Sequence, residues 1–298
     1  MNEQKKPNLF IIGAPKCGTT SMIHYVGQHP EVFVSPVKEP HFFNTDSGHR
    51  FYFSEDNYLE LFGSATPEHR YRCEGSVWYL YSKEAIDNIL KFNSKAKFII
   101  MLRSPVEMFF SLHQELLFGG SEDIKSAVEA WNLQEQRKSG NNIPLGCKDP
   151  SFLQYGQSCK LGQQVQSLQD KVSRENITYV LLDDLKTNPN KAYRHILKFL
   201  NINEKVLESY EIVNIKKVRK SYALSKFFIW VTKLKSRLGI KGGFGIATAI
   251  NKHNVSHNIS ISEKEKNLLI SELKKYFDDD ICLLEGLINR DLTNWKTI

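Results

Sequence analysis

The sequence lacks the features that mark secreted, membrane-spanning and zinc-binding proteins. Residues 1–8 contain no apolar stretch of the kind that forms a signal peptide. The apolar run Phe227–Val231 is far shorter than the roughly 20 residues of a membrane-spanning helix. The five cysteines are widely spaced, without a CxxC pair or a histidine at zinc-ligand spacing. We therefore expect a soluble, cytoplasmic protein with reduced thiols, no membrane span and no zinc site.

Acidic residues are missing from one long segment, and this absence accounts for the basic character of the chain. Between Asn214 and Lys241 there are nine Lys or Arg and no Asp or Glu, which exceeds the whole net charge of +7. Residues 214–241 are called the basic segment below. A long, evenly basic face is typical of nucleic-acid binding, whereas a local cluster suits a small polyanionic ligand or a membrane surface at least as well. We predict no nucleic-acid partner.

Several apolar runs carry no polar alternation, which is typical of strands covered on both faces in a parallel sheet. Three such runs occur, and two further segments are weaker strand candidates. The strong candidates are Asn8–Gly13, Lys97–Leu102 and Ile177–Leu182, and the weaker ones are Val32–Ser35 and Tyr71–Glu74.

Helix-start signals follow these runs. The pairs Ser104-Pro105 and Asn188-Pro189 each supply a cap residue and a first-turn proline for a helix. The last third of the chain, from about Ser221, is predicted to be mostly helical. Because strands and helices alternate, we predict an α/β fold with a central parallel sheet flanked by helices and a helical C-terminal third. No linker divides the chain, so residues 1–298 are predicted to form a single domain.

A glycine-containing loop, Gly13-Ala14-Pro15-Lys16-Cys17-Gly18-Thr19-Thr20, joins the first predicted strand to a helix over Cys17–Gln28. Consecutive backbone N–H groups and the positive end of a helix favour a bound oxyanion. In the common nucleotide loop GxxxxGK[ST], the lysine follows the second glycine. Here Thr19 occupies that position and the lysine is Lys16. The loop is thus phosphate-loop-like, but it does not suit Mg-ATP in the usual way.

The spacing from Lys16 to Thr20 resembles the nucleotide loop of sulfotransferases, which use 3′-phosphoadenosine 5′-phosphosulfate (PAPS). The resemblance implies that Cys17, Gly18, Thr19 and Thr20 hold the 5′-phosphate, while Lys16 reaches the oxygen that bridges phosphate and sulfate. Charge builds on that oxygen as sulfate departs, so a cation there stabilises the transition state more than the ground state. A lysine can supply this charge without a metal.

The strand candidate Lys97–Leu102 ends in an arginine, Arg103, and Ser111 follows it along the next predicted helix. A magnesium nucleotidase would place an acidic residue at such a strand end to hold the ion. In sulfotransferases an arginine at this strand end and a serine eight residues later both bind the 3′-phosphate of PAPS, and Arg103 and Ser111 have the same spacing. The resemblance implies the same role for Arg103 and Ser111. An arginine–phosphate contact is charge-assisted and can be bidentate, so it could also select the donor.

The segment Lys38-Glu39-Pro40-His41-Phe42-Phe43 resembles the KEP-HFF segment of carbohydrate-type and bacterial sulfotransferases. In that family the glutamate takes the acceptor's proton, and the resemblance implies this role for Glu39. A positioned base contributes on the order of 10²–10⁴ in rate. His41 is the alternative base, because the ordinary histidine pKa near ~6.5 suits neutral pH.

A further segment, Glu74–Tyr79, resembles the stretch that lines the acceptor cleft in the family, although its glutamate and glycine are swapped and its proline is absent. The resemblance implies that Trp78 and Tyr79 contact the acceptor, together with Lys38 and Phe42. A place in the hydrophobic core is an equally open interpretation for the two aromatic residues of this segment.

The resemblance of these motifs to sulfotransferases implies a PAPS sulfotransferase fold and function. The enzyme would move a sulfuryl group from PAPS to a hydroxyl or amine of a small natural product or saccharide, releasing adenosine 3′,5′-bisphosphate without a metal. Two alternatives stay open. The strand ending in Asp183 is also typical of an ATPase and favours a magnesium-dependent NTP phosphotransferase or NTPase. The basic segment favours a non-catalytic, membrane-peripheral nucleotide-binding module. The acceptor, the adenine-stacking residue and the oligomeric state are not assigned.

Overall fold

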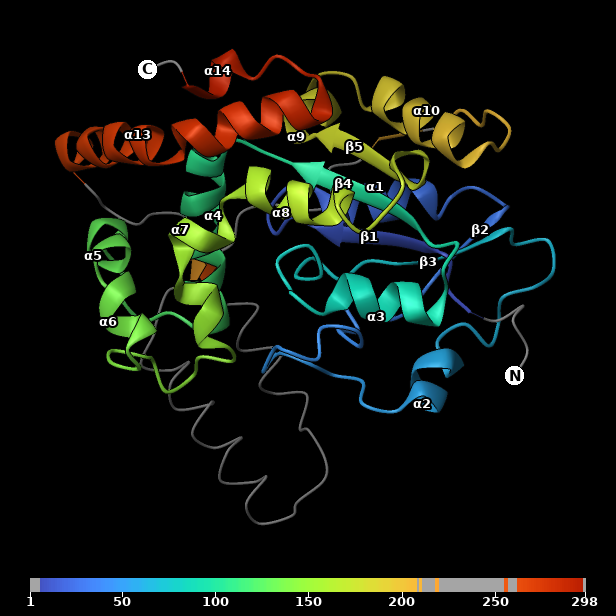
Figure 1. The fold of residues 1–298 in the computed structure, drawn as a ribbon, viewed down its shortest axis with the longest axis horizontal. Helices are drawn as coiled ribbons and strands as arrows, with labels where there is room; N and C mark the ends of the chain where they lie inside the picture. The colour runs from blue at the N-terminus through green and yellow to red at the C-terminus, as the bar shows by residue number, and fades with distance from the viewer. Residues whose placement is uncertain (1–5, 208, 211–217, 220–254, 257–261, 297–298) are drawn as a thin grey trace, which may run out of the picture. The chain divides into compact units, whose positions relative to one another are not determined.

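A computed structural model describes most of the chain (Figure 1). The described residues are 6–207, 209–210, 218–219, 255–256 and 262–296. The chain divides into two compact units. The first unit comprises Met1–Met108, Cys159–Asn214 and Lys274–Ile298, and the second comprises Phe109–Ser158 and Ile215–Leu273. The single-domain assignment stays a prediction. Apart from Val218 and Arg219, the basic segment lies outside the described residues.

The first unit is built on a sheet of five parallel strands in the order β2-β3-β1-β4-β5 (Figure 1). The strands are β1 (Leu9–Gly13), β2 (Val32–Val34), β3 (Tyr71–Glu74), β4 (Lys97–Leu102) and β5 (Ile177–Leu181). All residues of β1 are buried, as are all but the first of β4. Burial on both faces explains why these strands carry apolar residues without alternation. The predicted parallel sheet is confirmed.

The strand order creates a switch point in the middle of the sheet. β1 pairs with β3 on one side and with β4 on the other, so the chain leaves β1 at the place where the order reverses. The carboxyl ends of parallel strands meet at one edge, and ligands of open α/β sheets bind outside such a point. The loop after β1 therefore lies where a ligand is expected.

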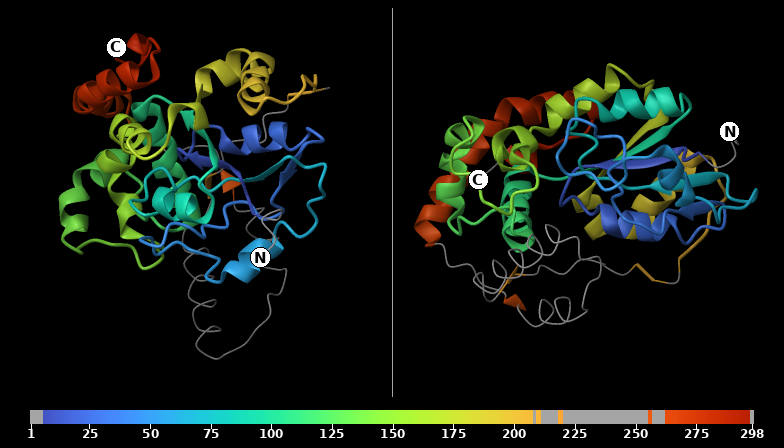
Figure 2. Two further views of the ribbon diagram at one scale, coloured as in Figure 1. Left: turned by 45° about the vertical axis from the view of Figure 1, so that its right-hand side comes forward. Right: turned by 90° about the horizontal axis from the view of Figure 1, so that it is seen from below.

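Helices flank this sheet. In the first unit they are α1 (Thr19–Val26), α2 (Glu55–Glu60), α3 (Ala85–Phe92), α8 (Leu161–Gln169), α9 (Leu182–Thr187) and α10 (Pro189–Leu200). Asn188 caps α10 as predicted, accepting a hydrogen bond from the N–H of Lys191 at 2.9 Å. Figure 2 shows α10 packed beside α1 in views from two further sides.

The described C-terminal region is mostly helical, as expected, with α13 (Glu263–Ile288) and α14 (Thr293–Lys296). A short antiparallel pair, β6 (Val218–Arg219) with β7 (Val255–Ser256), precedes these helices. The indole N–H of Trp295 donates to Asp183 Oδ2 at 3.1 Å. Asp183, the residue behind the ATPase alternative, thus anchors the C-terminal helix. No helix among the described residues is long and apolar enough to cross a membrane.

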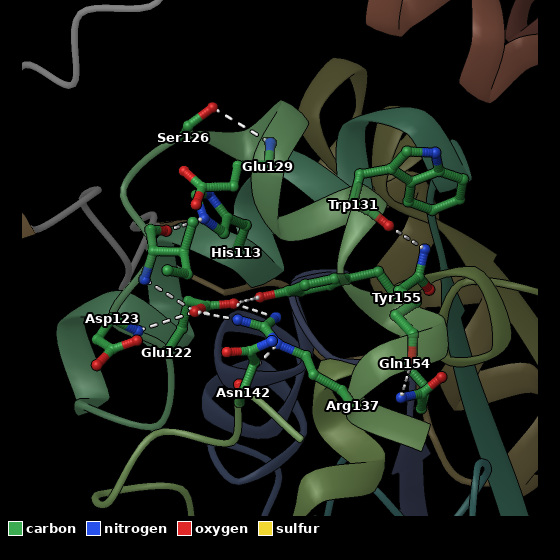
Figure 3. A network of polar contacts seen from close by, with 12 residues as sticks. His113, Glu122, Asp123, Ser126, Glu129, Trp131, Arg137, Asn142, Gln154 and Tyr155 are labelled. Carbon is green, nitrogen blue, oxygen red and sulfur yellow. Dashed lines mark hydrogen bonds and ion pairs between the residues drawn. The ribbon is translucent and has the colours of Figure 1, made fainter. Parts of the chain in front are cut away.

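A buried ion pair joins segments of the second unit (Figure 3). Its helices are most of α4 (Pro105–Gly119), α5 (Ala127–Asn132), α6 (Gln134–Lys138), the 3-10 turn η2 (Pro150–Leu153) and α7 (Tyr155–Ser158). Arg137 contacts both carboxylate oxygens of Glu122 at 2.6 and 2.7 Å, and the Tyr155 hydroxyl donates to the same carboxylate at 2.8 Å. Backbone N–H groups of Asp123 and Ile124 complete the set at 2.9 Å each. Because both oxygens of the Glu122 carboxylate accept hydrogen bonds and face a counter-charge, the cost of burying this charged group is offset.

Candidate active site at the sheet edge

The loop after β1 has the backbone shape of an anion cradle. Lys16 and Gly18 have φ angles of +64° and +88°, on either side of Cys17. Reversals of this kind point successive N–H groups into one concavity that binds anions. Gly13 is required for close packing, because a Cβ there would lie 2.7 Å from the carbonyl oxygen of Val77. The two glycines that defined the motif are therefore needed by the fold of the loop itself.

The N-terminus of α1 opens into this concavity. Gly18 is its N-cap residue, no side chain caps the helix, and no acidic residue stands in its first turn. The first N–H groups of a helix have no partner inside the helix, and the positive end of its dipole favours an anion. Thr19 is buried and Thr20 is half-buried at this helix start. Gly18, Thr19 and Thr20 thus form the start of α1, and their contact with the 5′-phosphate stays a prediction.

Cys17 plays a different part from its neighbours in the loop. Its N–H donates to the carbonyl oxygen of Ala14 at 3.3 Å, and its thiol donates to the carbonyl oxygen of Pro15 at 3.4 Å. Burial raises the pKa of this thiol to about 12, so it is uncharged and inert at neutral pH. Cys17 therefore stabilises the turn, and its predicted contact with a phosphate stays a prediction.

Arg103 lies against the loop. Its Nη1 donates to the carbonyl oxygen of Lys16 at 3.2 Å, while its Nε and Nη2 donate to Glu107 Oε2 at 3.0 and 2.8 Å. The structure thus brings the Arg103 guanidinium to the backbone of Lys16, although the two residues are far apart in the sequence. Ser111, the other predicted 3′-phosphate ligand, is half-buried on α4 in the second unit. Its role stays a prediction.

Residues 38–43, called the base loop below, hold Glu39 between two basic side chains. Lys38 Nζ lies 2.9 Å from Glu39 Oε1, and His41 Nε2 lies 3.5 Å from Oε2. Burial raises the pKa of Glu39, but the contacts with His41 and Lys38 outweigh it and lower the pKa to about 2. The carboxylate is therefore ionised at neutral pH and able to accept a proton.

His41 is the less accessible of the two candidate bases. Its side chain is fully buried, whereas that of Glu39 is 24% exposed. Among the described residues, neither ring nitrogen of His41 has a partner at hydrogen-bond geometry. The 3.5 Å contact with Glu39 is an ion-pair distance rather than a well-formed hydrogen bond. The geometry therefore favours Glu39 as the group that an acceptor can reach.

The base loop is held from beneath by the segment that follows β3. The N–H of His41 donates to Ser76 Oγ at 3.1 Å. The N–H groups of Phe42 and Phe43 donate to the Tyr79 hydroxyl at 2.9 and 3.2 Å. Three consecutive backbone donors are thus satisfied by two side chains. Since Glu39 and His41 both have positive φ angles, of 57° and 50°, these contacts hold the loop in a conformation that L residues rarely adopt.

A second carboxyl group lies below these contacts. Glu74, at the end of β3, is 1% exposed and accepts from the Tyr58 hydroxyl at 3.0 Å and from Ser76 Oγ at 2.9 Å. Burial raises the pKa of Glu74 to about 7, against the hydrogen bonds from Ser76, Tyr79 and Tyr58, which lower it. Sequence reasoning gave Glu74 no role of its own. An acidic residue ending a buried strand was the available signal.

The family description "Sulfotransferase domain" matches residues 6–228, well over half of the chain. The chain belongs to the sulfotransferase domain family. Membership confirms the predicted family and favours the sulfotransferase prediction over the NTP phosphotransferase and the non-catalytic module.

Relatives and a solved structure carry the same family name. Carbohydrate sulfotransferase 15 of Mus musculus is 28% identical over 250 residues, which are 66% of this chain and 44% of the relative. Heparan sulfate glucosamine 3-O-sulfotransferase 5 of Mus musculus is 30% identical over 129 residues, which are 41% of this chain and 34% of the relative. The chain thus spans less than half the length of these relatives. The crystal structure of a sulfotransferase from Alicyclobacillus acidocaldarius superposes with a TM-score of 0.71 at 25% identity, over 98% of this chain and 99% of that chain.

In this sulfotransferase-family chain, the four predicted acceptor contacts differ in accessibility. Lys38 is exposed at 47% of its side chain, and Phe42 is half-buried with its ring stacked on Tyr58 at 4.4 Å. Trp78 is only 7% exposed and Tyr79 is fully buried. The core interpretation thus fits the described position of both aromatic residues, and Tyr79 supports the base loop. Their contacts with an acceptor stay predictions.

No group of three or more His, Cys, Asp or Glu side chains that could hold a metal ion occurs within the described parts of this sulfotransferase-family chain. All five cysteines are free thiols, and Cys17, Cys73 and Cys159 are buried. The independence from metal that the sequence predicted is not tested by this geometry.

Proposed function

We propose that this protein transfers a sulfuryl group from PAPS to a hydroxyl or amine group of a saccharide or small natural product. One observation carries the proposal. The loop between β1 and α1 combines a phosphate-binding backbone, a lysine within the loop and an arginine hydrogen-bonded to that lysine's carbonyl group. This set suits a donor that carries several phosphate groups.

The residues at the loop fit such a donor. PAPS supplies the sulfuryl group, and its adenosine 3′,5′-bisphosphate is the leaving group. Gly18, Thr19 and Thr20 would hold the 5′-phosphate at the helix start, where the dipole favours negative charge. Arg103 would bind the 3′-phosphate, because a guanidinium forms strong, directional hydrogen bonds with phosphate oxygens.

Lys16 would stabilise the leaving group. As the acceptor forms its bond to sulfur, the bond from sulfur to the bridging oxygen breaks and negative charge builds on that oxygen. An ammonium group held by a rigid loop offsets this charge without reorganising during the reaction. The positive φ of Lys16 and the hydrogen bond from Arg103 to its carbonyl group both restrict this loop.

Glu39 would take the proton from the acceptor. Its ionised carboxylate has the right protonation state, but its low pKa makes it a weak base at rest. Lys38 is one cause of that low pKa. If Lys38 turns toward an anionic acceptor, its hold on Glu39 weakens and the carboxylate becomes a stronger base. Binding of the acceptor would then activate the base.

A saccharide is the acceptor class that we favour. The names of the relatives refer to carbohydrate and to heparan sulfate glucosamine. The basic Lys38 beside Glu39 suits a sugar that already carries acidic groups. Metal independence and a cytoplasmic location are further parts of the proposal that await measurement.

Donor binding is tested first, by thermal shift with adenosine 3′,5′-bisphosphate, PAPS and Mg-ATP. A ligand at 100 times its Kd stabilises the folded state by about 2.7 kcal/mol. We expect stabilisation by the bisphosphate and by PAPS in the presence of a chelator. ATP turnover that a chelator abolishes, without stabilisation by the bisphosphate, would overturn the proposal.

Turnover is tested next, with ³⁵S-labelled PAPS and a panel of desulfated and sulfated glycosaminoglycan oligosaccharides. Lys16→Ala should lower kcat by about 10²–10³, and Glu39→Gln by about 10²–10⁴. The matched controls are Lys91→Ala on α3 and Glu60→Gln on α2, both exposed residues. A Glu39→Gln enzyme with the same kcat as the Glu60→Gln control would remove Glu39 from the mechanism.

A further inference from the structure

A chain of hydrogen bonds leads from a buried carboxyl group to the base loop. Ser76 Oγ accepts a hydrogen bond from the N–H of His41 at 3.1 Å and donates one to Glu74 Oε2 at 2.9 Å. We infer that Glu74 is a positioning residue for Glu39: its carboxylate orients the Ser76 hydroxyl, which in turn holds the backbone of the base loop. The inference rests on the proposed function, since Glu39 is the proposed base.

The orientation follows from what each group can donate. A hydroxyl has one proton and two lone pairs, whereas an ionised carboxylate only accepts. Ser76 must therefore direct its proton at Glu74, which leaves its lone pairs for the N–H of His41. A neutral acid or an amide at position 74 would present a donor in place of an acceptor to one of the hydroxyl groups of Ser76, Tyr58 and Tyr79. One hydroxyl would then lose its acceptor and turn away.

The base loop needs such support because its backbone conformation is unfavourable for L residues. The positive φ angles of Glu39 and His41 persist only where surrounding contacts hold them. Reaction geometry is demanding, since a displacement of about 1 Å can cost on the order of 10²-fold in rate. Loss of the Ser76 contact would free the backbone between these two residues, and the carboxylate of Glu39 would move with it.

A second hydrogen bond to the same carboxylate provides a matched control. Tyr58, on α2, donates to Glu74 Oε1, but its hydroxyl makes no hydrogen bond with the base loop among the described contacts. Tyr58→Phe removes this bond and keeps the ring that stacks on Phe42. Because this bond lowers the pKa of Glu74, kcat of the variant is compared with that of wild type at about pH 9, where Glu74 is ionised and the route through Ser76 is intact.

The positioning role also predicts a dependence on pH. The titratable groups around Glu74 are Glu39 in the base loop, Tyr58 on α2, Cys73 in β3 and Tyr79 after β3. The pKa of Glu74 is about 7, whereas that of Glu39 is about 2. As pH falls through about 7, Glu74 becomes a neutral acid and the orientation of Ser76 is lost. We therefore expect kcat to fall as pH drops below about 7, because Glu74 becomes protonated. In Glu74→Gln this pH dependence should disappear.

The test uses the full chain carrying ¹³C-labelled glutamate carboxyl groups. Glu39 is assigned by Glu39→Gln, and its carboxyl chemical shift is followed by NMR from pH 5 to 9 in wild type, Glu74→Gln, Ser76→Ala and Tyr58→Phe. We expect the Glu39 shift of wild type to change near pH 7, where Glu74 titrates and the base loop responds. This step should be absent in Glu74→Gln and Ser76→Ala and should persist in Tyr58→Phe. This readout requires neither donor nor acceptor.

Turnover gives the second readout, with labelled PAPS and the best acceptor of the oligosaccharide panel. Glu74→Gln and Ser76→Ala should each lower kcat at least tenfold, with the Kd of adenosine 3′,5′-bisphosphate unchanged within twofold, while Tyr58→Phe keeps kcat within threefold. A step in the Glu39 chemical shift near pH 7 that persists in Ser76→Ala, or a loss of kcat in Tyr58→Phe equal to that in Ser76→Ala, overturns the inference. If wild type transfers no sulfate, the proposed function fails, and the NMR titration alone decides the positioning role.

Discussion

Arg103 donates a hydrogen bond to the backbone carbonyl oxygen of Lys16 at 3.2 Å. The contact ties the end of β4 to the loop that follows β1, and it places a guanidinium group beside the proposed phosphate cradle. The side chain of Arg103 is 13% exposed, so its charge is partly shielded from water. A partly desolvated cation at this position attracts phosphate more strongly than one in solvent.

Replacement of Arg103 should weaken donor binding selectively. Hydrogen bonds to charged groups contribute about 1.5–3 kcal/mol, so Arg103→Gln should raise the Kd of adenosine 3′,5′-bisphosphate by about tenfold to hundredfold. Adenosine 5′-monophosphate lacks the 3′-phosphate, and its Kd should stay within threefold. Calorimetry measures both ligands. Equal losses for the two nucleotides would show that Arg103 supports the loop and does not bind the 3′-phosphate.

Glu107 should compete with the donor for Arg103. Its carboxylate accepts from Arg103 at 2.8 and 3.0 Å, and its side chain is 51% exposed. Exposed ion pairs contribute about 0–1 kcal/mol, so Glu107→Gln should tighten bisphosphate binding by at most about fivefold. The same calorimetric comparison measures the effect. Weaker binding in this variant would mean that Glu107 orients Arg103 for the ligand.

Gly18 should resist substitution. Its φ angle is +88°, and an added Cβ would lie 2.8 Å from Leu182 Cδ1. Gly18→Ala should lower the free energy of unfolding by about 1–3 kcal/mol and weaken bisphosphate binding. Gly286→Ala is the matched control, because that glycine is exposed in α13 with no atom near the added Cβ. Denaturant unfolding compares the two, and equal stabilities would contradict the argument.

The ion pair of the second unit should be sensitive to loss of one partner (Figure 3). Arg137→Met leaves the carboxylate of Glu122 buried without its counter-charge, which costs about 3–5 kcal/mol. Burial would then raise the pKa of Glu122, so the loss should shrink as pH falls. Lys138→Met, at an exposed neighbouring position, should change stability by less than about 0.5 kcal/mol. If the loss of unfolding free energy in Arg137→Met were the same at pH 5 and pH 8, it would contradict this explanation.

Glu74 should make stability fall as pH rises. The folded-state pKa is raised from 4.5 to about 7, so the folded protein holds this proton more tightly than the unfolded chain does. Ionising Glu74 in the folded protein therefore lowers the free energy of unfolding. This loss is absent below about pH 4.5, grows up to about pH 7, and is then constant. Glu74→Gln should remove it. The stability of this variant relative to wild type should therefore rise between pH 5 and 8, by on the order of 3 kcal/mol. Denaturant unfolding at several pH values checks the sign.

Much of the sheet was predictable from local patterns. Three of the five strands were recognised because burial on both faces leaves unbroken apolar runs such as Lys97–Leu102, and β2 and β3 were only weaker candidates, since β3 carries Arg72 and Glu74. The start of α10 was recognised because Asn188 and Pro189 are a cap and a first-turn proline. The motif already placed Glu39 ahead of His41 as the candidate base. The burial of the His41 side chain, which favours the same order, could not be read from its own segment.

The chemistry of single segments could be recognised in the linear chain: the cradle around Lys16, the carboxylate of Glu39 and the arginine after β4 each belong to short motifs. The partners of those groups could not. Arg103 meets Lys16 because parallel strands bring their carboxyl ends to one edge of the sheet, and Glu74 meets Tyr58 through the packing of α2 beside the end of β3. Backbone preferences and apolar periodicity act between near neighbours in sequence. Burial, pKa shifts and hydrogen-bond partners are set by packing between distant segments, so they emerge only once the chain has folded.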